Sequence, residues 1–172
     1  TLVDWIHEYY PSIVHAQVGE PIVQTNGEII EKPGIVHRID RETSGVLLIT
    51  KTQESFLNIK AQFQARTIKK NYKTIVQGSF RELHGIIDKP IGRSKSDFRR
   101  WSAEYGARGE MRESLTEYDV LGQGESKKIK FSYLDVFPHT GRTHQIRVHF
   151  KAIGHSILGD KLYAPKGPVA LG

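Results

Sequence analysis

The sequence contains no cysteine, so it forms neither disulfide bonds nor thiolate metal sites, and it suits the reducing environment of the cytoplasm. It has no apolar run close to the roughly 18 residues that a membrane-spanning helix needs. Nor does it show a charged segment followed by an apolar stretch, which is the pattern of an export signal. These absences predict a cytoplasmic protein that makes no contact with a membrane.

Metal-binding spacings are also missing. His139, His144 and His149 lie near one another, and His37 lies near Asp40, but neither group matches H-E-x-x-H or a zinc finger. We therefore expect no metal site. Metal binding by these histidines is kept only as a minor alternative.

Acidic residues are scarce in most of the chain, although not at its beginning. Residues 1–35 hold five acids and one lysine, a net charge of −4, so the remaining residues carry +10 and the whole chain +6. Concentrated Lys and Arg are typical of proteins that bind a polyanion, because each contacted phosphate releases counterions. A basic but solvated surface has the same composition, so charge alone leaves both interpretations open.

The length of 172 residues suits one compact domain, and we expect residues 1–172 to form it. Strand patterns outnumber helical ones and several are joined by hairpins, which predicts an α+β fold with a mixed, largely antiparallel β-sheet and packed helices. The predicted helices are 2–10, 52–65 and 144–153, and the predicted strands are 45–51, 71–78, 82–91, 113–122 and 127–138.

The sequence also predicts where the turns between these helices and strands lie. Pro11 is expected to end the first helix, and a brief hairpin is expected around Asn26-Gly27. Strands 71–78 and 82–91 are expected to be joined by a short turn, and residues 123–126 to form the turn of a later hairpin. Residues 92–112 are expected to be irregular and basic, with Phe98, Trp101 and Tyr105 interleaved.

The segment GIVHRIDRETSG, residues 34–45, places Asp40 among three cationic neighbours, His37, Arg38 and Arg41. An exposed ion pair of this kind contributes only about 0–1 kcal/mol. Asp40, however, shortly precedes the predicted buried strand, and loops held by buried structure commonly carry functional groups. A surface salt bridge, a metal ligand and a catalytic carboxylate all remain open at this point.

A second candidate segment is PHTGRTHQIRVHF, residues 138–150, where Arg142, Arg147 and three histidines surround a turn that opens a helix. A helix N-terminus flanked by arginines is receptive to phosphate or carboxylate. The alternative is that these are ordinary solvated or packed helix residues. Their density favours a site.

Four stretches, in order, resemble the motifs of the RluA/RluC/RluD-type RNA pseudouridine synthases. They are PGIVHRIDRETSGVLLITKT (33–52), KKNYKTIVQG (69–78), ESLTEYDVL (113–121) and GRTHQIRVHFKAIGHSILGDKLYA (141–164). Ile39 and Ser156 are mild departures from the Leu and Pro of the family pattern. The resemblance implies that the chain is a pseudouridine synthase catalytic domain.

These enzymes convert uridine in RNA to pseudouridine: the C1′–N1 bond breaks, the uracil reorients, and C1′ rejoins at C5. The resemblance implies no cofactor, because the reaction needs neither redox chemistry nor an external nucleophile. It implies structured RNA as the partner, with large-subunit ribosomal RNA favoured and tRNA as the second choice. No obligate protein partner is expected.

By the same resemblance, Asp40 is the carboxylate that attacks C1′ or removes a proton from C2′, and both routes remain open. Arg147 is its implied partner, which keeps it ionised through a two-bond guanidinium fork. Tyr72 packs against the flipped uracil and helps to remove the C5 proton.

Further residues are implied to hold the RNA. Arg38 enters the position that the target base leaves, because a planar cation stacks better than a lysine. Ile146 forms an apolar wall for the base. The other implied contacts to RNA are Arg142 and His144.

The family pattern also includes strands before and after the segment seen here, so we expect an incomplete or short member with exposed sheet edges. Two alternatives follow from other classes of protein. One is a catalytically idle RNA-binding module with this fold, and the other is a metal-dependent hydrolase that uses the histidines.

Overall fold

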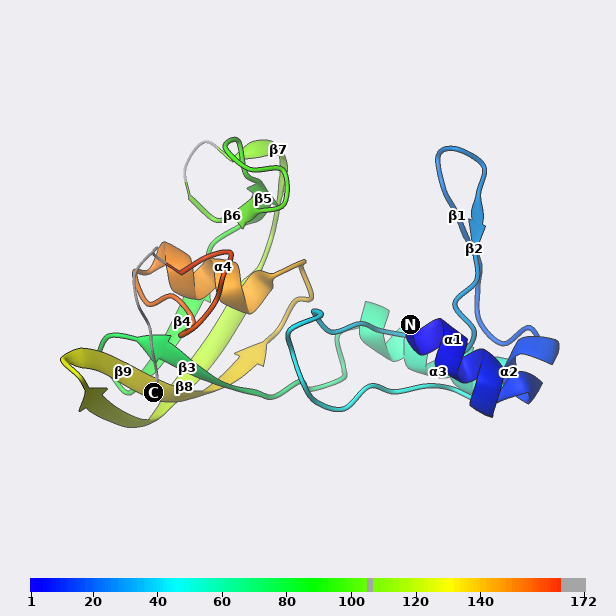
Figure 1. Cartoon of the computed structure of the whole chain (residues 1–172), viewed down its shortest axis with the longest axis horizontal. Coiled ribbons are helices and arrows are strands. Elements are labelled where there is room, and N and C mark those ends of the chain that lie inside the picture. Colours follow the sequence, from blue (N-terminus) through cyan, green and yellow to red (C-terminus); the bar gives the residue numbers. More distant parts are fainter. Residues whose placement is uncertain (105–106, 165–172) are drawn as a thin grey trace. The chain divides into compact units, whose positions relative to one another are not determined.

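The computed structural model describes residues 1–104 and 107–164 (Figure 1). The chain forms two compact units, Thr1–Ile68 and Lys69–Gly172, which we describe separately as the first and second units. The α+β fold class predicted from the strand and helix patterns is confirmed. Among the described residues, no helix has the length and apolar character needed to cross a membrane.

Helices with side-chain caps build the first unit. The hydroxyl of Thr1 accepts the amide of Asp4 and caps α1 (Leu2–Tyr9), and Thr52 caps α3 (Gln53–Gln64) as predicted. Pro11 ends α1, but it also begins a second helix, α2 (Pro11–His15), because proline is well suited to the first helical position. The core of this unit consists of Ile6, Ile13, Val18 and Phe56.

The expected hairpin around Asn26-Gly27 is present. Strands β1 (Ile22–Val23) and β2 (Ile29–Ile30) pair antiparallel, and Gly27 has a φ of +83°, a conformation that a side chain would disfavour.

The predicted buried strand over residues 45–51 is wrong. This described segment runs as a loop in which Ile49 forms an isolated bridge with Ile35, while Val46 is 88% exposed. The amide of Leu48 is satisfied by the ring of His37 (2.8 Å) rather than by a neighbouring strand. A run of apolar residues cannot by itself show that a partner strand exists.

The second unit is built on a four-stranded antiparallel sheet with the order β3 (Tyr72–Gln77), β9 (Ile129–Pro138), β8 (Leu115–Ser126) and β4 (His84–Asp88). Helix α4 (Gln145–Ala152) packs on this sheet, and its Phe150 joins the core. The other buried members of that core are Val76, Ile87, Tyr118, Leu134 and Val136. Gly154, with a φ of +82°, follows α4 as predicted.

Two details of strand pairing differ from the prediction. Strands β3 and β4 are not neighbours, because β9 and β8 lie between them in the sheet. The β8–β9 hairpin turns at Lys127-Lys128, with φ values of +48° and +65°, rather than at residues 123–126, which belong to β8. Two positive φ values match the twist of a two-residue hairpin turn. The turn therefore forms at the two lysines, although Gly124 had indicated the earlier position.

The expectation of exposed sheet edges is only half correct. Residues 156–158 cover the outer edge of β3, where the amide of Gln77 donates to Ser156 (2.9 Å) and that of Leu158 donates to Ile75 (2.9 Å). On the opposite side, β4 is the edge strand of the sheet.

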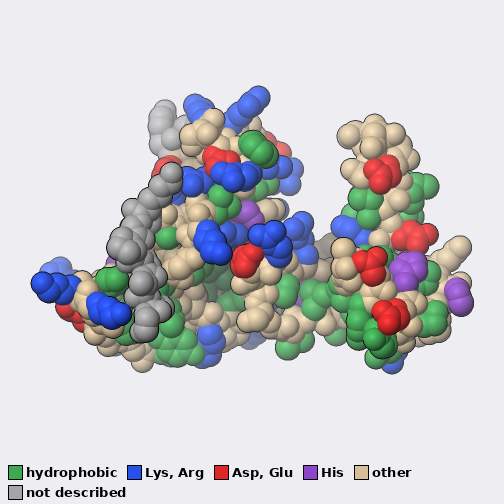
Figure 2. All heavy atoms as spheres, viewed as in Figure 1, with side chains coloured by type: hydrophobic (Ala, Val, Ile, Leu, Met, Phe, Trp, Pro, Cys, Tyr) green, Lys and Arg blue, Asp and Glu red, His purple; other side chains and the backbone are tan. Residues whose placement is uncertain are grey.

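Residues 91–112 are more regular than expected. They contain a small sheet with the order β6 (Trp101–Ser102), β5 (Ile91–Arg93) and β7 (Arg108–Arg112). Figure 2 shows Lys and Arg side chains gathered over this part of the second unit. Phe98, in the loop between β5 and β6, is 85% exposed, whereas Tyr105 lies outside the described residues.

His149 is completely buried between α4 and the strands. Its Nε2–H donates to the carbonyl of Lys89 (2.9 Å), so its Nδ1 accepts from the hydroxyl of Thr116 (2.9 Å). Burial lowers the pKa of His149, and the hydrogen bond to Lys89 opposes this only in part.

We expect this histidine to make folding sensitive to mild acid. The folded pKa is lowered, so the unfolded chain takes up a proton first, near its ordinary pKa of about 6.5. The stabilisation is therefore complete above that pH and declines as the pH falls below it. Urea unfolding between pH 5 and 8 measures the slope of the free energy of unfolding against pH, and His149→Gln should make this slope smaller. Equal slopes for wild type and His149→Gln would contradict the assignment, while the exposed His84→Gln serves as control.

Candidate active site

The loop that carries Asp40 is braced on both sides within the first unit. The ring of His37 stacks on Phe63 of α3 with 5.0 Å between centroids, and its Nε2 accepts the amide of Leu48. The amide of Thr43 donates to the backbone carbonyl of Asp40 (2.9 Å) and closes a turn. Asp40 is partly buried and Arg38 is exposed. The loop therefore presents Asp40 from a fixed backbone.

The cations around Asp40 differ in what they do. Arg41 pairs with its neighbour Glu42 (2.9 Å), and both side chains are largely exposed, so this pair contributes little to stability. His37 is a brace for the loop, a role that the sequence did not indicate.

In the second unit, Tyr72 is the first residue of β3. It lies opposite Val136 of β9 and packs against the core of the sheet. Lys70, two residues earlier, donates from Nζ to the carbonyl of Thr140 (2.8 Å). The start of β3 is thereby tied to the turn before α4, which brings the second and fourth motifs together.

A buried amide holds the turn before α4. Gln145 accepts the amide of Arg142 (2.9 Å) and the hydroxyl of Thr140 (2.7 Å) on Oε1. Its Nε2 donates to the carbonyl of Leu115 (3.0 Å) and to the hydroxyl of Thr116 (2.9 Å). Gln145 was not among the predicted residues, although a glutamine on the buried face of an amphipathic helix was an available signal.

His144 precedes α4 in a strained conformation. Its φ of +55° lies in the left-handed region, which side chains other than glycine seldom adopt and which is concentrated at functional sites. Its Nδ1 lies 2.8 Å from the hydroxyl of Tyr163. Nearby, Arg142 donates from Nε to the carbonyl of Glu113 (3.0 Å), and Ile146 packs against the core of the sheet.

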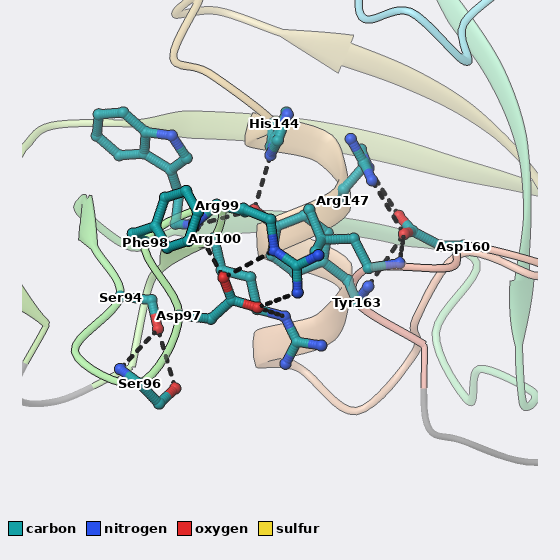
Figure 3. A network of polar contacts seen from close by, with 12 residues as sticks. Ser94, Ser96, Asp97, Phe98, Arg99, Arg100, His144, Arg147, Asp160 and Tyr163 are labelled. Atoms are coloured by element: carbon teal, nitrogen blue, oxygen red, sulfur yellow. Dashed lines mark hydrogen bonds and ion pairs between the residues drawn. The ribbon is translucent and has the colours of Figure 1, made fainter.

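Arg147 is held by a carboxylate that sequence reasoning missed. Its Nε and Nη2 donate to the two oxygens of Asp160 at 2.7 and 3.0 Å (Figure 3). The side chains are 18% and 4% exposed, respectively, so the ion pair is largely buried. The guanidinium also lies over the ring of Tyr163, 4.9 Å from its centroid. Asp160 stands in the GDKLYA end of the fourth motif, which was the available signal.

The profile of the RNA pseudouridylate synthase family matches residues 19–152. The chain belongs to this family. The match includes Asp40, Tyr72 and Arg147, and it ends before Asp160 and Tyr163.

Proteins similar to this chain bear out the assignment to the pseudouridylate synthases. An "uncharacterized RNA pseudouridine synthase" of Aquifex aeolicus (strain VF5) is 47% identical over 137 residues, which cover 80% of this chain and 42% of that protein. The ribosomal large subunit pseudouridine synthase D of Zymomonas mobilis subsp. mobilis is 37% identical over 134 residues, covering 78% and 40%. This chain thus spans less than half the length of these curated relatives.

A solved structure is similar to this chain as well. It is that of human RNA pseudouridylate synthase domain containing 1, with a TM-score of 0.72 and 30% sequence identity. The similarity covers 77% of this chain and 55% of the human one.

Three histidines in and around the fourth motif have separate partners. His139 contacts Glu117 (2.8 Å), His144 contacts Tyr163, and His149 contacts Lys89 and Thr116. Within residues 1–104 and 107–164, no three histidine, aspartate or glutamate side chains gather in a way that could hold a metal ion. The arrangement therefore gives no support to the metal-dependent hydrolase.

The two units divide the predicted site residues between them. Arg38 and Asp40 lie in the first unit, and Tyr72, Arg142, His144, Ile146 and Arg147 lie in the second. In the second unit, the Lys70–Thr140 contact links the strand of Tyr72 to the turn and helix that carry the other four. The pairing of Asp40 with Arg147 stays a prediction.

Proposed function

We propose that this chain isomerises uridine to pseudouridine in structured RNA, in the cytoplasm, with Asp40, Tyr72 and Arg147 as its catalytic residues. The observation that carries the proposal is the family match over residues 19–152, which includes all three residues. The name of the Zymomonas relative favours large-subunit ribosomal RNA as the substrate. tRNA is the second candidate.

Each catalytic side chain has a task that its chemistry suits. Asp40 acts at the ribose, either as the nucleophile at C1′ or as the base at C2′, and it must be ionised for both. We assign to Arg147 the positive charge that keeps the carboxylate of Asp40 ionised. Tyr72 offers an aromatic face to the uracil and a hydroxyl for proton transfer at C5.

The target base has to leave its helix before it can react, which costs a few kcal/mol. Arg38 is exposed on the Asp40 loop, and we assign it the space that the base vacates. Ile146 forms an apolar wall for the extruded base, while Arg142 and His144 contact RNA.

The small sheet β5–β7 has the features of a surface for single-stranded RNA. Its exposed or partly exposed cations are Arg93, Lys95, Arg99, Arg100, Arg108 and Arg112. Phe98 projects among them as a base-stacking platform, and cations beside an exposed ring are the usual means of holding an unpaired strand.

Asp97 fixes the loop of this surface. Both its oxygens accept from Arg99, at 3.1 and 2.8 Å, and the hydrogen bonds from Arg99 lower the pKa of Asp97 to about 2. The guanidinium of Arg93 lies over the ring of Trp101, 4.4 Å from its centroid. Cationic side chains are thus oriented before any RNA binds.

The Tyr72→Phe variant is expected to bind RNA normally and to turn over slowly. It keeps the ring that packs on the sheet and removes only the hydroxyl, so the loss of rate should be roughly 10²-fold. Single-turnover rates of pseudouridine formation and filter-binding affinities measure the two effects. A wild-type rate would remove Tyr72 from proton transfer.

The proposed function is tested by incubating the chain with bacterial ribosomal RNA and tRNA transcripts and mapping new pseudouridines. Formation of pseudouridine at defined positions supports the proposal. Salt-sensitive RNA binding without pseudouridine, in every RNA tried, would instead identify an idle RNA-binding module.

A further inference from the structure

Asp160 lies outside the proposed chemistry, yet hydrogen bonds converge on it from two parts of the second unit. Its Oδ2 accepts Nε of Arg147, and its Oδ1 accepts Nη2 of Arg147 and the amides of Leu162 (2.8 Å) and Tyr163 (3.0 Å). Its side chain is only 4% exposed. A carboxylate buried to this degree is retained only where its partners replace the lost water.

The ionised form of Asp160 is the stable one in the folded protein. Burial alone raises its pKa, but the hydrogen bonds from Arg147 and from the two backbone amides lower it more, so the net pKa lies below its ordinary value. The pair with Arg147 therefore keeps its charge at neutral pH.

Tyr163 provides the second contact to Arg147. It is 3% exposed, and its ring lies beneath the guanidinium. Its hydroxyl accepts the amide of Trp101 (2.9 Å) and meets Nδ1 of His144 (2.8 Å). Figure 3 shows the two contacts that join Arg147 to the carboxylate of Asp160. Asp160 thus binds one edge of the guanidinium, and the ring of Tyr163 packs on one face of it.

A second bidentate pair in the same unit shows what is distinctive here. Asp97 and Arg99 make the same two hydrogen bonds, but they are two residues apart in one loop, and Arg99 is 64% exposed. Arg147 and Asp160 are thirteen residues apart, and they join helix α4 to the segment that follows it. Their contact fixes a tertiary arrangement rather than a local turn.

We propose that Asp160 is a positioning residue that orients Arg147 for the reaction, with the ring of Tyr163 as the surface on which the guanidinium rests. A guanidinium is a rigid planar fork, so binding its Nε/Nη2 edge determines where its other edge points. The consequence for turnover rests on the proposed function. A reacting group displaced by about 1 Å loses on the order of 10²-fold in rate.

The variant Asp160→Asn tests this role. Asparagine still accepts the amides of Leu162 and Tyr163, together with Nη2 of Arg147, on its carbonyl oxygen. Its NH₂ group replaces Oδ2, so Nε of Arg147 loses its acceptor and the pair loses its negative charge. We expect kcat to fall roughly 10²-fold while KM for RNA stays within about twofold. The matched control is Asp119→Asn, at an exposed carboxylate of the same unit that pairs with His84, and its turnover should be unchanged. Turnover by Asp160→Asn within about twofold of wild type would overturn the proposal.

A second measurement does not depend on activity. The Nε–H signal of Arg147 in ¹H–¹⁵N spectra is assigned by its loss in Arg147→Lys. This proton should exchange slowly with water in wild type, and in Asp160→Asn it should exchange as fast as those of exposed arginines. An Nε–H that is unprotected in wild type, or unchanged in Asp160→Asn, counts against the proposal even if the chain makes no pseudouridine. If Asp160→Asn does not fold, Asp160→Glu keeps the charge but shifts the carboxylate by one methylene. It should then show a reduced kcat at an unchanged KM, and an unchanged kcat would overturn the proposal.

Discussion

The Asp40→Asn variant is expected to lose pseudouridine formation by roughly 10³-fold or more while its affinity for RNA stays nearly unchanged. Asparagine has the size of aspartate, but it can neither attack C1′ nor take a proton from C2′. The side chain is partly buried on a loop braced by His37 and Thr43, so the substitution should leave the backbone in place.

The measurement is the single-turnover rate on an RNA that the wild type modifies, together with the dissociation constant of the same RNA. Glu42→Gln is the matched control, because it removes an exposed carboxylate two residues from Asp40 that pairs with its neighbour Arg41. Unchanged turnover by Asp40→Asn would exclude the assigned mechanism. Equal losses in both variants would point to the charge of the loop rather than to Asp40.

The Arg147→Ala variant is expected to lose both activity and stability. Removing the guanidinium leaves the carboxylate of Asp160 buried without its cation, and breaking a buried pair in this way costs about 3–5 kcal/mol. Because the folded pKa of Asp160 is lowered, this contribution is present above the ordinary carboxyl pKa of 3.8 and is lost as the pH falls through the folded value. The difference in stability between wild type and variant should therefore shrink in acid.

A double variant separates the two losses. Arg147→Ala combined with Asp160→Ala removes both charges, so it should recover much of the unfolding free energy while turnover stays roughly 10²-fold or more below wild type. Urea denaturation and single-turnover assays measure the two quantities, and Arg81→Ala, at an exposed arginine of the same unit, is the control. Recovery of turnover along with stability would show that Arg147 acts only in folding.

Some local elements were predictable because their causes lie within a few residues. Thr1 and Thr52 cap their helices through amides three residues ahead, and Gly154 follows α4 in the left-handed conformation. The antiparallel pairing of β8 with β9 was also predicted, although its turn was misplaced by a few residues. Positive φ at two lysines was not a signal that composition offers.

The misplaced elements share a different cause. The apolar run at 45–51 was taken for a buried strand, but whether a strand forms depends on a partner supplied from elsewhere in the chain. The order of β3 and β4 likewise depends on β8 and β9, which come later in the sequence. Such pairings are non-local, and hydrophobic patterns in a short window do not contain them.

The motifs by themselves determined the family and the residues on which the proposed chemistry rests, because reactive groups must have particular chemical types at particular places in a pattern. Only the tertiary structure decided which groups hold them. Beside their local contacts, Gln145 and Asp160 each bind a residue thirteen or more positions away, as in Asp160 with Arg147 and Gln145 with Leu115. The physical reason is that a buried polar group is stable only beside partners that replace water, and the folded chain alone determines which partners those are.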